Sequence, residues 1–297
     1  MNRSWCRAAV AILVVGLIPQ SLSAQRMPKR IFVSAVDGAG RPVADLTAAE
    51  FQITEDGVKR DVTRATLGQA PLRIVLMVDS STATAPMMNN FRSALTSFID
   101  MLPPEHEIAL ITTGGQIRVR TPPSVDREKL KTEINRFASE GGANAFLETM
   151  IESDHRFLKP APTQWPVFVI VTTDNGETRR EPDIDRYNKF MNDFLGRGGT
   201  AHAVVISGKQ TGPVTDLAQN LVQNTGGMYV TIVVDSGLPE RLKDIAERLA
   251  DDHHLMVERY EVEFTGDAKL LQPTINVTVG RDDVRLQMSP RRPFSLR

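Results

Sequence analysis

The 297-residue sequence carries 35 Lys and Arg residues against 36 Asp and Glu residues, a formal net charge of −1 at pH 7. This balance gives no electrostatic reason to expect nucleic acid or an anionic membrane surface as a partner. A hydrophobic content of 41% and a charged content of 24% are typical of a globular protein. Composition therefore excludes a strongly basic nucleic-acid-binding chain, and the length allows one large domain or two modest ones.

Residues 1–24 have the pattern of a signal peptide. Arg3 and Arg7 precede an uncharged apolar run at 8–18, and the following PQSLSA ends in small residues suited to a signal peptidase. The run is shorter than the roughly 17–25 residues that span a bilayer. The sequence therefore predicts export to the periplasm or the extracellular space, with cleavage near Ala24. Membrane attachment is expected only if the segment stays uncleaved.

Residues 25–70 are predicted to form an amino-terminal β flank. The stretch IFVSAVD is followed by a GAGRP turn, a capping box from Thr47 to Glu50, and two short strands around the hairpin turn Asp56-Gly57. The carboxyl-terminal flank, residues 254–297, has the same character in RYEVEF and TINVTVG. Neither flank is long enough to bury a core alone. We therefore expect the two flanks to pair into one small, β-sandwich-like unit.

The middle of the chain, residues 71–253, alternates apolar runs with amphipathic segments. Five runs are typical of strands buried on both faces: RIVLMVD, HEIALIT, PVFVIVTTD, AHAVVIS and MYVTIVV. Two intervening segments place their apolar residues on one helical face: Met88, Phe91, Leu95, Phe98, Ile99 and Leu102, and later Leu242, Ile245 and Leu249. The pattern predicts an α/β fold, an open and mostly parallel sheet with helices on both faces, inserted between the two flanks.

Polar residues follow the carboxyl ends of three of these predicted strands. They occupy residues 79–84 (DSSTAT), 112–115 (TTGG) and 172–175 (TTDN). Loops at the carboxyl ends of parallel strands meet at one edge of an open sheet. We therefore expect these three segments to be neighbours in space.

These motifs resemble the metal-ion-dependent adhesion site of von Willebrand factor type A domains. In that family a first strand ends in Asp-x-Ser-x-Ser, a Thr follows a Gly-Gly turn, and a later strand ends in Asp. The corresponding stretches here are Asp79-Ser80-Ser81-Thr82-Ala83, Gly141-Gly142-Ala143-Asn144 and Thr172-Thr173-Asp174. The resemblance covers residues 71–253 and implies a Rossmann-like fold. The flank DGAGRPVADLTAAEFQITEDG extends it to secreted proteins of the acidobacterial type that are related to this family.

The resemblance implies that Asp79, Ser81 and Asp174 hold Mg²⁺, or Mn²⁺ or Ca²⁺, and that the carboxylate of a protein ligand completes the coordination. Ala83 and Ala143 replace the Ser and Thr of the family, so two hydroxyl oxygens are lost. Mg²⁺ wants six oxygens but keeps several waters, so weak binding remains possible. Oxygens of Thr82, Thr84 or Asn144 are candidate substitutes. The alternative is that Asp79 and Ser81 only accept backbone N–H groups where a helix begins.

The sequence therefore predicts an exported interaction or adhesion module with a degenerate metal-ion-dependent adhesion site and an unidentified protein partner. A metal-free scaffold in the cell envelope is the alternative. An Asp-dependent hydrolase or phosphatase is the weaker interpretation, because Ser81 stands where such enzymes have a second Asp, and no lysine is clearly placed to hold phosphate. We therefore expect no enzymatic activity.

Two other polar clusters are interpreted as solvated helix surface. They are Glu152-Ser153-Asp154-His155 and Asp251-Asp252-His253-His254. Consecutive residues cannot generally align a nucleophile with its base, and adjacent side chains point apart from a shared metal. Neither cluster is therefore predicted to be a catalytic or metal site.

The predicted leader can be tested on protein purified from its host. Intact-mass and amino-terminal peptide analysis should find a mature chain that begins near Gln25, because the small residues before it suit a signal peptidase. Recovery of the chain from the cytoplasm with Met1 or Asn2 still first would contradict export.

Overall fold

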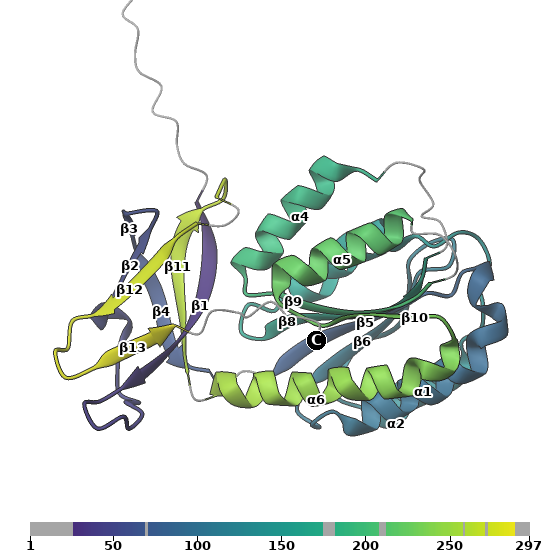
Figure 1. Ribbon diagram of the computed structural model, residues 1–297, viewed down its shortest axis with the longest axis horizontal. Coiled ribbons are helices and arrows are strands. Elements are labelled where there is room, and N and C mark those ends of the chain that lie inside the picture. Colours follow the sequence, from purple (N-terminus) through teal and green to yellow (C-terminus); the bar gives the residue numbers. More distant parts are fainter. Residues whose placement is uncertain are drawn as a thin grey trace, which may run out of the picture.

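The computed structural model describes residues 26–68, 71–174, 182–207, 212–257, 259–270 and 273–288. The predicted leader lies outside these ranges. The described residues form an α/β unit and a smaller β unit side by side (Figure 1). No helix within the described ranges is long and apolar enough to cross a membrane.

A six-stranded sheet in the order β10-β9-β8-β5-β6-β7 forms the centre of the α/β unit. Neighbouring strands are parallel except for the antiparallel pair β6 and β7. The strands are β5 (Leu72–Val78), β6 (Glu107–Thr112), β7 (Arg118–Ser124), β8 (Trp165–Thr173), β9 (Thr200–Ile206) and β10 (Tyr229–Ile232). The five apolar runs are thus confirmed as strands. Strand β7 was not predicted, and its Pro122 and Pro123 are tolerated because it lies at the sheet edge.

Helices cover both faces of this sheet (Figure 1). One face packs against α1 (Met88–Met101), α2 (Arg127–Arg136) and α6 (Leu238–Val257). The other packs against α3 (Phe146–Ser153), α4 (Ile184–Gly196) and α5 (Pro213–Thr225). Shorter turns of helix are η1 (Ala48–Glu50), η2 (Thr82–Met87), η3 (Asp154–Leu158) and η4 (Asp235–Gly237). The predicted fold class, an open and mostly parallel α/β sheet with helices on both faces, is confirmed.

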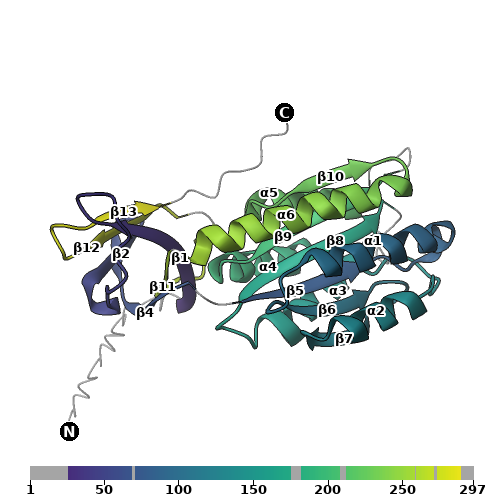
Figure 2. The ribbon, with the colours of Figure 1, turned by 90° about the horizontal axis from the view of Figure 1, so that it is seen from below.

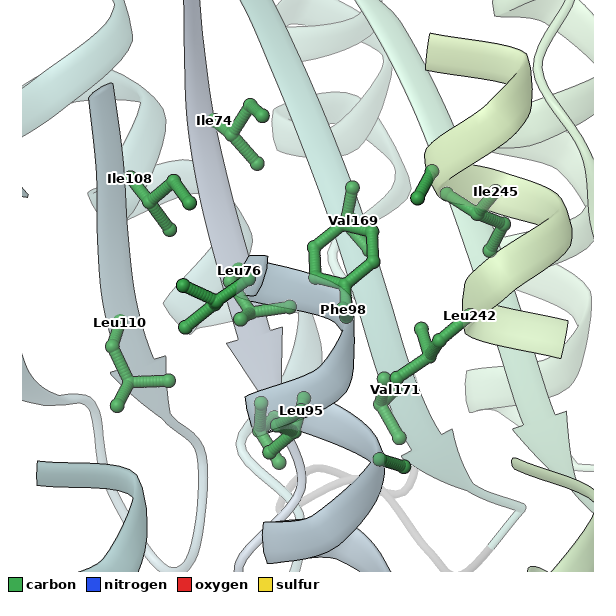
Figure 3. Close-up of a cluster of buried hydrophobic side chains, with 14 of the residues drawn as sticks. Ile74, Leu76, Leu95, Phe98, Ile108, Leu110, Val169, Val171, Leu242 and Ile245 are labelled. Carbon is green, nitrogen blue, oxygen red and sulfur yellow. The ribbon is translucent and has the colours of Figure 1, made fainter. Parts of the chain in front are cut away.

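Strand β5 supplies side chains to both cores of the α/β unit. Ile74 and Leu76 face the α1 and α6 side, whereas Val75 and Met77 face the opposite core. Figure 3 shows Leu76 among buried side chains of neighbouring strands and of helices α1 and α6, including Phe98. Each fully buried Val, Leu, Ile, Phe or Met contributes about 1.5–3 kcal/mol through the hydrophobic effect. Continuous apolar runs are therefore required here, because no face of the strand meets water.

The two ends of the chain combine in the β unit. One sheet has the order β13-β1-β11-β4, and a second has the order β12-β2-β3. The amino-terminal strands are β1 (Arg26–Val36), β2 (Phe51–Glu55), β3 (Val58–Arg60) and β4 (Val62–Leu67). The carboxyl-terminal ones are β11 (Tyr260–Asp267), β12 (Ile275–Val279) and β13 (Arg285–Met288). Each sheet therefore mixes strands of both flanks, as predicted from their inability to form a core alone.

Aromatic and charged side chains join the two units. Trp165, at the start of β8, packs its ring edge-on against Phe32 of β1 with 5.2 Å between ring centroids. The indole N–H of Trp165 donates to Glu261 of β11 at 3.2 Å, and Arg30 pairs with the same buried carboxylate at 3.1 Å. Burial lowers the pKa of Arg30, and the charge of Glu261 opposes that shift. Arg30 and Glu261 both lie in the β unit, so among these side chains Trp165 makes the contacts that join the two units. Loss of either charged partner would leave a buried charge uncompensated beside it.

The interleaved flanks generate a prediction about truncation. Deletion of residues 259–297 removes both neighbours of β1, the β12 partner of β2 and the β11 partner of β4. Limited proteolysis with mass spectrometry should then find cleavage within residues 26–68, while the helices and strands of the α/β unit resist as they do in the full chain. If the truncated chain keeps its amino-terminal flank resistant, the two flanks fold independently.

Candidate functional site

Three loops meet at the carboxyl edge of the central strands. Strands β5 and β8 are parallel neighbours with Val78 opposite Val171, so Asp79 leaves β5 beside the end of β8. The Asp79 N–H donates to the carbonyl oxygen of Val171 at 2.8 Å, and the Thr113 N–H donates to that of Val78 at 3.1 Å. The expectation that segments 79–84, 112–115 and 172–174 are neighbours agrees with these contacts, and Asn175 lies outside the described residues.

The Asp79 carboxylate is buried and surrounded by protein donors. Its exposed fraction is 1%. Oδ1 accepts the Ser81 N–H at 2.8 Å. Oδ2 accepts the Thr173 N–H at 3.1 Å, the Thr173 hydroxyl at 2.5 Å and the Asn144 amide at 3.2 Å. Hydrogen bonds to an ionised group are about twice as strong as neutral ones, so these four donors satisfy a charge that burial would otherwise penalise.

Asn144 connects all three loops. Its side chain is fully buried, and its Oδ1 accepts the Thr113 hydroxyl at 2.7 Å. Its Nδ2 donates to Thr172 Oγ1 at 2.8 Å in addition to Asp79. Asn144 therefore presents a donor to Asp79, and this nitrogen cannot act as a cation ligand. The other two candidate substitutes are also engaged, because Thr84 donates to the Ser81 carbonyl at 2.8 Å and Thr82 to the Gly142 carbonyl at 3.3 Å.

Ser81 and Asp174 lie at the same edge but have different surroundings. Ser81 Oγ is buried and has no hydrogen-bond partner among the described residues. Ser81 immediately precedes η2, yet its side chain makes no capping hydrogen bond. The Asp174 carboxylate is half-buried and accepts the Ser207 hydroxyl at 2.9 Å, beyond the end of β9. The capping alternative thus fits Asp79, which accepts a backbone N–H, and does not fit the Ser81 side chain.

A second buried carboxylate at this edge was missed from the sequence. Glu140 accepts the hydroxyls of Ser80 and Thr112, each at 2.7 Å. It also pairs with Arg120 and, at 3.3 Å, with Arg118, both from the unpredicted strand β7. Without β7 the sequence offered no partner for this carboxylate. Its position directly before the Gly-Gly turn was the only available signal.

Gly114 must be glycine because its backbone approaches Ser80 closely. A Cβ at this position would lie 2.5 Å from the Ser80 carbonyl oxygen, a distance that real Cβ atoms do not show. The Gly114 N–H donates to Ser80 Oγ at 2.9 Å. This hydrogen bond, together with the one that Ser80 donates to Glu140, holds Ser80 in place next to Asp79.

The prediction that residues 152–155 form a solvated helix surface is wrong for two of the four residues. Ser153 and Asp154 are buried, and Asp154 accepts two hydrogen bonds from one Arg197 nitrogen at 2.7 and 2.8 Å. Burial raises the pKa of Asp154, and the Arg197 charge opposes that rise. Ser153 Oγ has no hydrogen-bond partner among the described residues, so nothing here supports a triad. The sequence could not identify Arg197 as the partner, because it follows α4.

The residues at the carboxyl edge do not fit a magnesium ion as they lie. Such an ion takes six oxygens in near-octahedral geometry. Ala83 and Ala143 supply no side-chain oxygen, and Oδ2 of Asp79 already accepts three hydrogen bonds. Ser81 Oγ, which has no hydrogen-bond partner among the described residues, and the half-buried Asp174 carboxylate are the candidate oxygens that remain. They supply few protein ligands for a cation that takes six oxygens.

No family model matches this chain, and no curated protein matches it in sequence. Solved structures do match in fold. A von Willebrand factor type A protein from Catenulispora acidiphila aligns with a TM-score of 0.51 at 18% identity, over 75% of this chain and 50% of that chain. The α/β unit has the von Willebrand factor type A fold. This chain therefore spans about half the length of the Catenulispora protein.

Two further structures align with the same fold at lower scores. BatB, a conserved hypothetical protein from Bacteroides thetaiotaomicron, has a TM-score of 0.48 at 13% identity, over 61% of this chain and 98% of that one. Proximal thread matrix protein 1 from the mussel byssus, solved with a zinc-occupied metal-ion-dependent adhesion site, has a TM-score of 0.48 at 14% identity. That alignment covers 60% of this chain and 47% of the mussel protein.

Restoring the two missing hydroxyls tests the residue assignment at this edge of the von Willebrand factor type A unit. Isothermal titration with Mg²⁺ and Mn²⁺ should detect no binding by the parent, because Ala83 and Ala143 supply no side-chain oxygen and Oδ2 of Asp79 already accepts three hydrogen bonds. The double variant Ala83→Ser with Ala143→Thr should bind measurably, since two oxygens return to the site. Adding Asp79→Ala to that variant should abolish the binding.

Either of two results would contradict this account. If the double variant binds no better than the parent, Ala83 and Ala143 do not occupy ligand positions. If the parent binds as tightly as the double variant, the hydrogen bonds to Asp79 do not prevent coordination.

Proposed function

We propose that this protein is an exported interaction module that binds a protein partner at the carboxyl edge of its von Willebrand factor type A unit, without a bound cation. The observation that carries the proposal is the satisfaction of the buried Asp79 carboxylate by donors from Ser81, Asn144 and Thr173. These bonds hold the loops in one shape without a metal. In this proposal the adhesion site is degenerate, and its loops are held by protein side chains and backbone groups without a cation.

Exposed apolar residues at the same edge support a docking surface. The Ser207 N–H donates to the carbonyl oxygen of Ile232, so the chain leaves β10 next to the end of β9. The next two residues, Val233 and Val234, are 81% and 60% exposed. Exposed apolar groups bordered by polar residues mark interaction sites on soluble proteins. The polar neighbours here include Asp235, which accepts the Asn90 amide at 2.8 Å.

A scaffold role and a hydrolytic role are the competing proposals. A nucleophilic Asp79 is not supported, because its carboxylate is 1% exposed and already accepts four hydrogen bonds. A passive scaffold would use the same rigid loops but would need no exposed apolar rim. Export, and the relation to secreted proteins of the acidobacterial type, rest on the leader pattern and on the flank motif of the sequence.

Capture from the native cell envelope tests the proposal. Immobilised protein should retain a partner whose yield does not change when EDTA replaces Mg²⁺, because no cation bridges the interface. The change Val233→Glu should remove that partner by placing a charge in an apolar contact. Val58→Glu is the matched control, since Val58 is 54% exposed and lies on β3 of the β unit.

The outcomes separate the competing proposals. Release of the partner by EDTA would mean that a cation completes the interface. Equal capture by the Val233→Glu and Val58→Glu variants would place the interface elsewhere, and capture of nothing by the parent would favour the scaffold.

A further inference from the structure

A second cluster of ligand-bearing side chains lies at the opposite end of the sheet. Glu105 and His106 lie in the loop between α1 and β6, and His253 lies near the end of α6. One ligand atom from each of the three residues lies within 4.8 Å of the other two. The sequence alone predicts that His253 lies on a solvated helix surface, because the chain has no second group of ligand residues at a suitable spacing. The fold supplies that second group.

His106 presents a buried nitrogen that the protein leaves unsatisfied. Its side chain is fully buried, and its ring packs edge-on against His253 with 4.5 Å between centroids. Nδ1 accepts the Leu72 N–H at 3.4 Å, whereas Nε2 is buried and has no hydrogen-bond partner among the described residues. A buried polar atom without a partner is expensive, and in native proteins it often indicates a missing ion or water.

We propose that Glu105, His106 and His253 form a zinc site. Two imidazole nitrogens and one carboxylate oxygen are a donor set that Zn²⁺ accepts, with a water as the fourth ligand. Imidazole nitrogen also disfavours Mg²⁺ and Ca²⁺, which prefer oxygen. The chemistry of this cluster therefore differs from that of the carboxyl edge, where the candidate ligands are all oxygens.

The cluster must contract slightly to hold the ion. Zinc bonds of about 2.0–2.1 Å place tetrahedral ligand atoms roughly 3.3 Å apart, closer than the 4.8 Å limit of the metal-free cluster. Glu105 is exposed, so its side chain has room to move toward the two rings. Coordination through His106 Nε2 moves the ring proton to Nδ1 and gives up the hydrogen bond from Leu72. The Leu72 N–H and the new Nδ1–H then face each other as two buried donors, which opposes binding, whereas the bond to zinc satisfies the buried Nε2.

Of the charged groups near this site, one opposes cation binding and one favours it. The Arg127 guanidinium donates to the carbonyl oxygens of Pro103 and His106 at 2.8 and 2.9 Å, so a fixed positive charge lies close to the ligands. This charge opposes cation binding, whereas the Glu105 carboxylate favours it. Each imidazole must be neutral to coordinate the ion.

The location gives the zinc a structural role at the junction of the two units. The His253 ring lies 5.4 Å from that of Trp165, which contacts Phe32 and Glu261 of the β unit. Helix α6 leads toward β11, as Figure 2 shows. An ion held by His253 and by the loop before β6 would fasten the end of α6 to the sheet where the chain passes into the β unit.

Trp165 provides a local reporter for this site. The chain has two tryptophans, and Trp5 lies in the predicted leader, so the change Trp5→Phe leaves Trp165 beside His253 as the single tryptophan whether or not the leader is cleaved. The full chain with this change, purified without a polyhistidine tag, is titrated with Zn²⁺ and separately with Mg²⁺. We expect one Zn²⁺ per chain by equilibrium dialysis, a saturable change in Trp165 emission and a higher midpoint of thermal unfolding. Mg²⁺ should cause none of these.

Matched variants decide whether these residues are the ligands. Loss of even an outer-shell partner weakens metal sites 10–100-fold, so His253→Gln and Glu105→Gln should each weaken Zn²⁺ binding by about tenfold or more. The exposed neighbour provides the control, and His254→Gln should bind like the parent.

The proposal is overturned if the parent binds no Zn²⁺, or if the ion binds without changing Trp165 emission. It is also overturned if His254→Gln loses as much affinity as His253→Gln. Both ligand variants alter residues that are not fully buried, and comparison of their unfolding midpoints without metal excludes misfolding as the cause of lost binding.

Discussion

A carboxylate that is buried at the end of a strand must be satisfied by its surroundings, because an unpaired buried charge is more expensive than almost any other defect. Asp79 is in this position, at the end of a strand that is covered on both faces. Its four donors come from its own loop, from the end of β8 and from the segment after the Gly-Gly turn. The loops at the carboxyl edge are therefore held in one arrangement by a single charge.

This constraint explains how the loops at the carboxyl edge keep one shape. Asn144 donates to Asp79 and to Thr172 and accepts from Thr113, so one amide connects the three loops. Glu140 acts in the same way behind Ser80, with the charge of Arg120 as its counterion. Fully satisfied networks of this kind make a buried polar region rigid. A rigid rim without a cation is compatible with protein binding, which needs a pre-formed surface more than it needs a metal.

At the opposite end of the sheet, the chain passes from α6 into the β unit. The strands of that unit come from both flanks of the sequence. Trp165 joins the units through its ring contact with Phe32 and its indole hydrogen bond to Glu261, whose charge is balanced within the β unit by Arg30. The cluster of Glu105, His106 and His253 lies beside this junction, and His106 Nε2 in it has no hydrogen-bond partner in the part of the chain that the structure describes. The candidate ligand atoms at the carboxyl edge are therefore oxygens, whereas those at the opposite end of the sheet include two imidazole nitrogens.

The sequence by itself determined the strands, the mostly parallel sheet and the pairing of the flanks. Uninterrupted apolar runs such as that of β5 fit only strands covered on both faces, and short β segments cannot fold alone. It also brought Asp79 and Thr173 to one edge, because the carboxyl ends of parallel strands always meet there. The partners of the buried charges were decided by tertiary structure alone. Strand β7, which supplies Arg120, has little apolar pattern, and His106 and His253 are distant in the chain. Which atom a side chain meets depends on register and packing between distant segments, and no local pattern of residues records it.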